Sequence, residues 1–315
     1  MTGKRVLITG AAGFVGSALV SGFVDLGWRV IAVDREIEGG WERSRVKCVV
    51  ADLSEEVPHD VQDVDLVVHG AWVTADPDSL GITTAEYFDL NLKPLLAVLG
   101  YVSRSKPATF VFLSSSGVFG PADAVDGLTD THQPSGRSPY AAAKRAAEGL
   151  VADGVGPDTH AHVVRLGYLF GPGEAPRSTR PHVSPVAAWR KALREGRSLE
   201  VRADDPAREW TFAPDLAGAL ALVVDGPPAG RPVHLGSPHV WKDSAIAALI
   251  AAQAPGAETV TAPAIGKMKP PMIPSDIPAL RSFDWTDPAE GLRLLDTEDG
   301  ARPRSPSGST SAIWK

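Results

Sequence analysis

The first half of the chain alternates short apolar runs with longer segments in which apolar residues recur every three to four positions. The short runs are rich in β-branched residues, which is typical of buried strands, whereas the longer period is that of a helix with one apolar face. Strands that alternate with helices form a parallel sheet covered by helices on both faces. We therefore predict a doubly wound α/β fold of the Rossmann type. The predicted strands are residues 6–9, 28–33, 46–50, 65–69 and 109–113.

The pattern also predicts the helices and the division of the chain into a sheet domain, a smaller lobe and a tail. The predicted helix over residues 83–103 contains Pro94, which we expect to bend or restart it. We assign residues 1–167 to the sheet domain and residues 168–295 mainly to a smaller substrate lobe, some of whose segments pack back onto the sheet. Residues 296–315 are rich in Ser, Pro, Gly and charge, so we expect a flexible tail there. Further helices are predicted over residues 138–152, 184–195, 214–224 and 242–252.

Three glycines follow the first predicted strand directly, at Gly10, Gly13 and Gly16. The first lets the chain turn sharply, the second lets a ligand approach the backbone, and the third lets the next helix pack closely on the sheet. That helix starts at Phe14 and Val15, and its free N–H groups and dipole suit a pyrophosphate. An ordinary tight turn is the alternative, but the position between a strand and a helix favours a dinucleotide site.

Asp34 stands at the end of the second predicted strand. A carboxylate at this place can accept hydrogen bonds from both hydroxyls of an adenosine ribose, and it repels a 2′-phosphate. Asp34 therefore favours NAD over NADP as the cofactor. Arg35 follows directly and weakens this preference, since a guanidinium can accommodate the extra phosphate.

Other small or polar residues follow the later strands at the same end of the predicted sheet. In doubly wound sheets ligands bind beyond the carboxyl ends of the strands, so residues at these ends collect in one crevice. We expect the glycine turn, Asp34 and Arg35 to meet a second group of residues there. This group comprises Asp52, Leu53, Gly70, Ala71 and Ser115.

Tyr140 and Lys144 begin an alanine-rich helix and, being four residues apart, project from the same helix face. A phenol titrates near pH ~10, and a nearby ammonium group stabilises the phenolate. Tyr140 can then exchange a proton with a substrate hydroxyl while a hydride moves to or from the cofactor, with Ser115 holding the same oxygen. An exposed lysine beside a half-buried tyrosine is the alternative, but the serine and the glycine turn favour the catalytic interpretation.

Composition and charge argue against several other classes of protein. The chain has 315 residues and a net charge of −7, with no basic surface for nucleic acid. Its single cysteine, Cys48, lies in an apolar run and is expected to be a buried strand residue in a reducing compartment. A signal-peptide pattern and an apolar run of ~18 residues are both missing, so we expect a cytoplasmic protein that does not span a membrane. The eight histidines lack metal-ligand spacing, so we predict no metal.

Together these motifs resemble the extended short-chain dehydrogenase/reductases of the NAD-dependent epimerase/dehydratase family, over nearly all of the chain before the tail. The resemblance implies catalytic roles for Ser115, Tyr140 and Lys144. It adds Asn91 as a helical residue that supports the site through water, and it implies that Asp52 contacts the adenine. It also implies a homodimer that pairs through the helices around Asn91 and Tyr140.

Departures from the family pattern narrow the expected reaction. Dehydratases of the family carry Asp-Glu directly after the catalytic residue, where this chain has Ser116 and Gly117, so we do not expect a 4,6-dehydratase. Sugar-nucleotide members contact the substrate pyrophosphate through an Asn where this chain has Tyr168, although Arg208 matches an arginine that many of them hold. Arg177 and Arg180, in a Pro- and Gly-rich loop, are candidates to bind a carboxylate or phosphate, with a solvated loop charge as the alternative. The candidate substrate contacts are Ser115, Ser116, Tyr168, Arg177 and Arg208.

The sequence thus predicts an NAD-dependent oxidoreductase that transfers a hydride between the nicotinamide and a secondary hydroxyl or ketone of a sugar-like small molecule. The alternative is an NAD-dependent sugar-nucleotide epimerase, which would use the same catalytic residues. A non-catalytic dinucleotide-sensing protein is a more remote alternative, because such relatives usually lose the Tyr/Lys pair that is present here.

Overall fold

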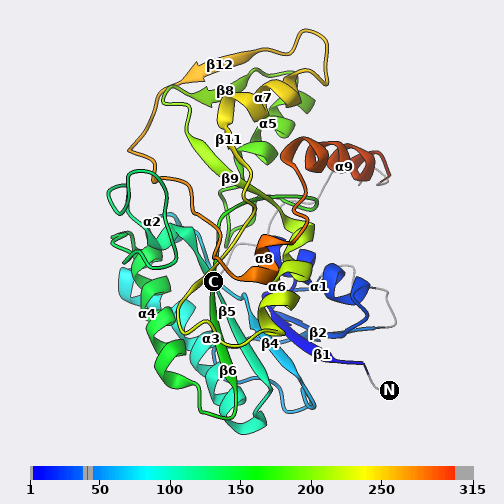
Figure 1. Ribbon diagram of the computed structural model, residues 1–315, viewed down its shortest axis with the longest axis vertical. Coiled ribbons are helices and arrows are strands. Elements are labelled where there is room, and N and C mark those ends of the chain that lie inside the picture. The colour runs from blue at the N-terminus through cyan, green and yellow to red at the C-terminus, as the bar shows by residue number, and fades with distance from the viewer. Residues whose placement is uncertain (1–2, 38–40, 42–44, 302–315) are drawn as a thin grey trace.

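A computed structural model describes residues 3–37, 41 and 45–301 (Figure 1). Its centre is a seven-stranded sheet in the order β10-β6-β5-β4-β1-β2-β3, and each pair of neighbouring strands is parallel. The strand order reverses between β1 and β4, which is where an open sheet of this kind leaves a crevice. The predicted doubly wound fold is confirmed. The strands are β1 (Arg5–Thr9), β2 (Arg29–Asp34), β3 (Val46–Val50), β4 (Leu66–His69), β5 (Thr109–Ser115), β6 (His160–Leu166) and β10 (Val233–Leu235).

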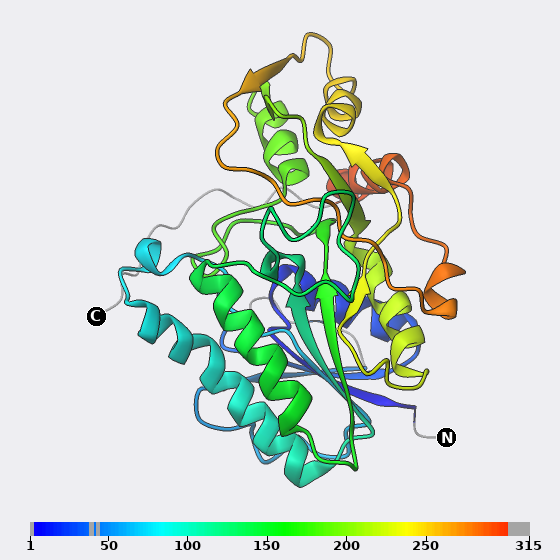
Figure 2. The same cartoon turned by 60° about the vertical axis from the view of Figure 1, so that its left-hand side comes forward.

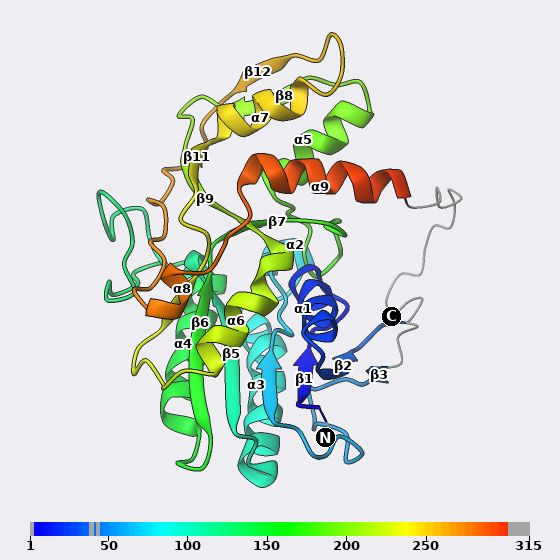
Figure 3. The same ribbon diagram turned by 45° about the vertical axis from the view of Figure 1, so that its right-hand side comes forward.

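Helices cover both faces of this sheet (Figures 1 and 3). One face carries α1 (Phe14–Asp25) and α6 (Leu216–Val224), and the other carries α3 (Thr84–Ser105) and α4 (Pro139–Gly154). Neighbouring strand residues point to opposite faces, so Ile8 packs in the first apolar core and Leu7 in the second. Burial on both faces explains why the strands read as continuous apolar runs.

The long helix α3 continues through Pro94, so of the two expected effects of this proline, a bend or a restart, the restart does not occur. A capping box closes its N-terminus, where the Thr83 side chain accepts from the Glu86 N–H and the Glu86 carboxylate accepts from the Thr83 N–H. Its apolar face, which includes Leu95 and Val98, is buried against the sheet and outweighs the one backbone bond that a proline removes. Neither α3 nor any other helix of the described ranges is both long and apolar enough to cross a membrane.

A smaller group of elements lies beyond one end of the sheet (Figure 1). It has a three-stranded sheet in the order β11-β9-β7 and the pair β12-β8, around a core that includes Trp189, Trp210 and Phe212. Two elements from the part of the sequence assigned to this lobe belong instead to the large sheet: β10 is one of its strands, and α6 packs on one of its faces. The division of the chain at residue 167 therefore stays a prediction. The remaining elements are α2 (Pro77–Leu80), β7 (Tyr168–Phe170), α5 (Pro185–Arg194), β8 (Leu199–Arg202), β9 (Ala207–Phe212), β11 (Val240–Lys242), α7 (Asp243–Ala251), β12 (Thr259–Ala262), α8 (Pro278–Arg281) and α9 (Pro288–Ala301).

Helix α9 corrects the predicted start of the tail, because it continues to Ala301 and makes residues 296–301 helical. The Asp296 carboxylate accepts hydrogen bonds from Arg190 on α5 and from Gln253 just beyond α7. These contacts tie the helix to the lobe, which an apolar-pattern argument does not detect. The rest of the predicted tail, residues 302–315, lies outside the described residues.

Strand β3 corrects the expectation for Cys48, whose side chain is exposed. The strand forms the edge of the large sheet, and most of its side chains are accessible. An apolar run at a sheet edge has the same sequence pattern as a buried strand, but it pairs with only one neighbouring strand and so remains more accessible to solvent.

Candidate functional site

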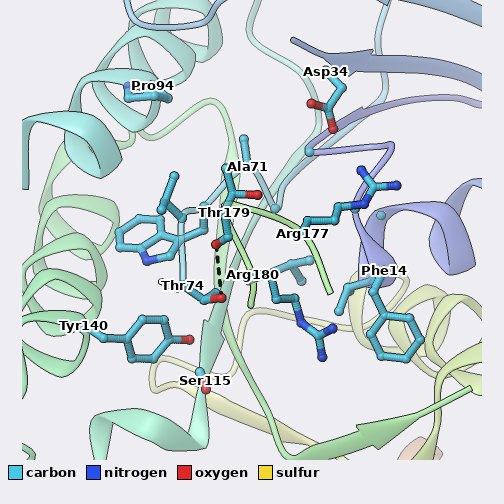
Figure 4. Close-up of a pocket in the computed structure, with 18 of the residues that line it drawn as sticks. Phe14, Asp34, Ala71, Thr74, Pro94, Ser115, Tyr140, Arg177, Thr179 and Arg180 are labelled. Atoms are coloured by element: carbon cyan, nitrogen blue, oxygen red, sulfur yellow. Dashed lines mark hydrogen bonds between the residues drawn. The ribbon is translucent and has the colours of Figure 1, made fainter. Parts of the chain in front are cut away.

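The structure has a cavity of about 790 Å³ beyond the carboxyl ends of the large sheet (Figure 4). Among the described residues, those that line it all fall between Gly10 and Pro185. Most of the predicted site residues therefore meet in one place, as expected from their positions at strand ends. They are Gly10, Gly13, Phe14, Val15, Gly16, Asp34, Arg35, Asp52, Leu53, Gly70, Ala71, Ser115, Tyr140, Lys144, Tyr168 and Arg177.

The glycine turn brings the first turn of α1 against the end of β1. A Cβ atom on Gly16 would lie 2.0 Å from the carbonyl oxygen of Gly10, so only glycine permits this close approach. Within the described part of the chain, no side chain caps the N-terminus of α1 at Gly13. The first N–H groups of the helix therefore face the cavity without a side-chain acceptor, which suits an anionic ligand.

Asp34 is the last residue of β2 and Asp52 follows the end of β3, and both line the cavity. The Asp34 carboxylate accepts from the N–H of Ala12, at 2.9 Å, and from the N–H of Arg35, at 2.7 Å. Asp34 thus fixes the glycine turn as well as presenting charge to the cavity. Hydrogen bonding from the backbone N–H of Ser54, at 2.8 Å, lowers the pKa of Asp52, so this side chain is a carboxylate at neutral pH.

Ser115 and Tyr140 face the same part of the cavity from β5 and α4 (Figure 4). The Ser138 side chain accepts from the N–H of Ala141 and starts α4, which places Tyr140 in its first turn. A Cβ atom on Gly117 would lie 2.8 Å from the Tyr140 ring and 3.3 Å from the Ser115 hydroxyl. The missing side chain at this position therefore lets the tyrosine and the serine come together.

The charge beside Tyr140 differs from the expectation. Burial raises the pKa of Tyr140, while a hydrogen bond with Ser115 and the positive charge of Arg180 lower it. Lys144 does not supply this charge: its ammonium donates to the carbonyl of Leu113 at 2.7 Å and lies 3.8 Å from the ring centre of Trp72. Burial lowers the pKa of Lys144 well below its usual value.

Three predicted site residues do not line the cavity. Asn91 is buried and uses its amide within the protein, accepting from the N–H of Val73 at 2.8 Å and donating to the carbonyl of Tyr87 at 3.1 Å. Ser116 is buried in a short 3-10 turn after β5. Arg208 forms a buried bidentate ion pair with Asp243, at 2.6 and 2.9 Å, instead of facing the cavity.

Arg208 still acts on the cavity wall through Tyr168. Its guanidinium lies 4.4 Å from the centre of the Tyr168 ring, and the ammonium of Lys269 lies 4.8 Å from the same ring. Behind this wall Glu209 is fully buried, and neither of its carboxylate oxygens has a hydrogen-bond partner among the described residues. Burial raises the pKa of Glu209, although the charge of Lys269 lowers it. Sequence reasoning missed Lys269, which lies far from any recognised motif.

A loop over residues 173–184 forms one side of the cavity and was only partly anticipated. The carbonyl of Thr179 accepts from the backbone N–H groups of Thr74, at 2.8 Å, and Ala75, at 3.1 Å. The same carbonyl is near the Thr74 hydroxyl (Figure 4). Thr74 and Thr179 line the cavity although no motif marked them in the sequence, and Arg180, a candidate from the loop composition, lines it too. Only the three-dimensional fold brings residues 74–75 and 179 together.

The arrangement can hold an extended anionic ligand and exchange a proton at one end of it. The glycine turn and Asp34 suit a dinucleotide, while Ser115 and Tyr140 suit a hydroxyl or carbonyl oxygen. In the described ranges no three His, Cys, Asp or Glu side chains gather as a metal site.

Comparison with known proteins places this geometry in a family. The sequence model of the NAD dependent epimerase/dehydratase family matches residues 6–236. UDP-glucuronic acid decarboxylase 2 of Arabidopsis thaliana is 32% identical over 251 residues, which are 75% of this chain and 54% of that protein. UDP-glucose 4-epimerase of Neisseria meningitidis serogroup B is 26% identical over 213 residues, or 59% of this chain and 62% of that protein. The chain therefore spans between half and two thirds of the length of these relatives.

Solved structures share the fold. UDP-glucose 4-epimerase from Thermotoga maritima has a TM-score of 0.80 at 20% identity, over 94% of this chain and 99% of its own. An NAD-dependent NDP-hexosamine 5,6-dehydratase involved in tunicamycin biosynthesis has a TM-score of 0.79 at 24% identity, over 95% and 99%. At these identities the likeness concerns the fold alone, whereas the family match covers most of the sequence. The cofactor of this family is NAD, which the glycine turn and Asp34 fit, and the chain belongs to the NAD-dependent epimerase/dehydratase family.

Proposed function

We propose that the protein is an oxidoreductase that transfers a hydride between NAD and a secondary hydroxyl or ketone of a sugar-like small molecule. One observation carries this proposal: Ser115, Tyr140 and Lys144 line the same cavity as the glycine turn and Asp34. Acid–base chemistry at a substrate oxygen is thereby combined with a dinucleotide site in one cavity.

In the proposed reaction Tyr140 moves the proton. In the reducing direction its neutral hydroxyl donates a proton to the substrate carbonyl oxygen as the adjacent carbon accepts a hydride, and a secondary alcohol results. The opposite direction returns the proton to the Tyr140 phenolate and the hydride to the nicotinamide. Because burial raises the pKa of Tyr140, its protonated form prevails at neutral pH. Ser115 orients the same substrate oxygen, and NAD, when bound, supplies the hydride chemistry.

Lys144 is proposed to act mainly by position. Its bond to the Leu113 carbonyl and its place over the Trp72 ring fix the ammonium at the cavity wall, one helical turn from Tyr140. There it can donate to a hydroxyl of the nicotinamide ribose. The proposed residues thus divide the work between proton transfer, substrate orientation and cofactor binding.

A sugar-nucleotide epimerase is the second candidate. The relatives support it, since several are UDP-glucose 4-epimerases. A dehydratase is disfavoured, because the second carboxylate that such members carry after the catalytic residue falls on Gly117. The site has no space for a side chain there, since a Cβ atom would lie 2.8 Å from the Tyr140 ring. Tyr168 further separates this chain from members that contact a pyrophosphate at that position.

We also propose that the protein is a cytoplasmic homodimer that pairs through α3 and α4. These helices lie side by side (Figure 2), and Leu96 and Leu150 on them are partly exposed. Light scattering of the purified protein measures the mass of the assembly and tests this part of the proposal.

Incubation of the protein with NAD and a panel of sugars, sugar acids and nucleotide sugars distinguishes the candidates. Net formation of NADH supports the proposed oxidoreductase, whereas exchange between two isomers without net NADH supports the epimerase. Binding of NAD without turnover of any compound would instead indicate a dinucleotide-sensing protein.

Tyr140→Phe tests the proton-transfer group. The variant keeps the ring and its packing but loses the proton, so turnover should fall by roughly 10²- to 10⁴-fold while NAD still binds. Steady-state kinetics and calorimetric titration measure the two effects separately. A folded, NAD-binding Tyr140→Phe protein with nearly full activity would refute the assignment.

A further inference from the structure

Arg180 is held at the cavity by a network that fixes its position before any ligand binds. Arg177 and Arg180 form a small antiparallel bridge, with backbone hydrogen bonds of 2.9 Å in both directions. The intervening Thr179 carbonyl ties this hairpin to Thr74 and Ala75. A long cationic side chain on an ordinary loop would lose much more freedom on binding a ligand.

Glu174 adds the second constraint. One of its carboxylate oxygens accepts from Arg180 Nη2 at 2.6 Å and from the Ser184 N–H at 2.8 Å, and the other accepts from the Ser184 hydroxyl. Ser184 in turn caps α5, so the guanidinium is anchored to a helix N-terminus. The Glu174 side chain is only 2% exposed, which makes this ion pair less open to competition from water.

The other terminal nitrogen of Arg180 remains unsatisfied. Nη1 is buried and has no hydrogen-bond partner among the described residues. The guanidinium also lies 5.0 Å from the centre of the Phe14 ring, which shields it without accepting a hydrogen bond. A buried cationic donor without an acceptor is unfavourable, and because the Arg180 side chain is 28% exposed and lines the cavity, a ligand that enters can reorient the guanidinium and supply the missing acceptor.

The place of the guanidinium indicates which ligand that is. Figure 4 shows Arg180 on the side of the cavity that holds Tyr140 and Ser115, whereas Arg177 extends toward Asp34. From this geometry we propose that Arg180 binds a carboxylate or phosphate group of the substrate, close to the carbon that reacts. The inference rests on the proposed function in placing the substrate beside Tyr140. The pyrophosphate of NAD offers the same anionic oxygens, so the test must separate the two sources.

The test compares wild-type protein with Arg180→Met, Arg180→Lys and the control Arg197→Met. Arg197 is exposed and pairs with Glu195 at the end of α5, away from the cavity. Calorimetry measures the Kd of NAD for each protein. It then measures the Kd of D-glucuronate, D-gluconate and malonate, with D-glucose as the neutral probe, for each NADH-saturated protein.

We expect at least one anionic probe to bind wild-type protein more tightly than D-glucose. Arg180→Met should weaken that binding by roughly 10- to 100-fold, the range for a hydrogen bond to a charged group, and Arg180→Lys by less. The Kd of NAD should stay within about twofold of wild type, and Arg197→Met should resemble wild type in both measurements.

Two results would overturn the inference. Weaker NAD binding in Arg180→Met, with unchanged binding of the probes, would assign the guanidinium to the cofactor pyrophosphate. The absence of any preference for an anionic probe over D-glucose would leave Arg180 without a substrate role. If wild-type protein bound neither NAD nor NADH, the proposed function itself would fail, which is a different result.

Discussion

At the level of single residues, the pKa values in the site depend on which charged side chains lie next to each group. The spacing of Tyr140 and Lys144 predicts a tyrosine–lysine pair, but the Lys144 ammonium lies over Trp72 and bonds to Leu113. Burial raises the pKa of Tyr140, and the positive charge that opposes this shift comes from Arg180, forty residues away in the chain. The sequence pattern therefore identifies Tyr140 as the candidate reacting group, whereas the charges around it can be found only from the folded structure.

Asp34 should determine the choice between NAD and NADP. Asp34→Ala removes the charge that repels a 2′-phosphate, so the ratio of the NADP Kd to the NAD Kd should fall by about tenfold, equivalent to ~1.4 kcal/mol. Asp34→Asn is the matched control, because its amide oxygen can still accept from the Ala12 N–H. Calorimetric titrations with both cofactors measure the ratio. Wild-type protein that binds NADP as tightly as NAD would contradict this role.

His69 should make stability depend on pH. Its side chain is fully buried, with Nδ1 2.8 Å from the Thr9 hydroxyl, and burial lowers the pKa of His69 to about 3. A folded-state pKa below the unfolded value of 6.5 contributes stability above pH 6.5, and this contribution is lost as the pH falls toward 3. Between pH 7.5 and 5.0 the loss is about 2 kcal/mol.

Urea denaturation at pH 7.5 and pH 5.0 measures this effect. The variant His69→Asn retains a polar partner for Thr9 but has no imidazole to protonate, so its stability should change less between the two pH values. The comparison uses the difference between the two proteins because His234, whose pKa burial lowers to about 4, contributes in both. Equal losses in wild type and variant would show that His69 does not carry the dependence.

At the scale of elements, buried polar contacts set how α4 lies against the sheet. Glu148, on the helix that carries Tyr140, accepts from Arg165 on β6 at 2.9 and 2.7 Å. It also accepts from the Ser114 hydroxyl on β5 at 2.6 Å. One carboxylate therefore links α4 to two neighbouring strands directly behind Ser115 and Tyr140.

Glu148→Ala should destabilise the protein strongly. Arg165 is 3% exposed, so the variant leaves an uncompensated charge in the core, at a cost of about 3–5 kcal/mol in the free energy of unfolding. Asp158→Ala is the control, since it breaks the exposed Lys106–Asp158 pair of 2.7 Å and should cost at most about 1 kcal/mol. Denaturant titration compares the two. A cost for Glu148→Ala no larger than that of the control would mean that Arg165 finds another partner.

At the scale of the whole molecule, segments far apart in the sequence complete the sheet domain. β10 extends the large sheet beside β6, and α6 packs on α1 although some 190 residues separate them. The α1–α6 contact is close, because a Cβ atom on Gly22 would lie 2.4 Å from the Cβ of Ala217. The later half of the chain therefore supplies part of the cofactor domain.

Gly22→Ala should destabilise the protein by about 1–3 kcal/mol, because the added methyl group separates α1 from α6. Gly149→Ala is the matched control: its Cβ meets no atom within 4 Å, and replacing an exposed helical glycine should stabilise by roughly 0.5–1 kcal/mol. Thermal unfolding of both variants should thus give shifts of opposite sign. A stabilising effect of Gly22→Ala would show that the two helices are not held at this distance in solution.

Patterns along the chain were sufficient to predict the local features: the strands and helices, the glycine turn after the first strand and Asp34 at the end of the second. The Tyr140–Lys144 spacing belongs with them. These follow from backbone sterics and from the period of apolar residues, which act between near neighbours. Strand ends in a parallel sheet necessarily share one edge, so the predicted cavity residues came together.

Long-range packing sets which predicted residues face that cavity and which do not. Asn91 and Arg208 bond to partners 18 and 35 residues away, and so turn away from the ligand space. Arg180 faces it because Thr179 is tied to Thr74 across 105 residues. The exposure of Cys48 likewise depends on β3 being at the sheet edge. These outcomes rest on long-range contacts, and a hydrogen bond between distant segments leaves no periodic trace in the sequence.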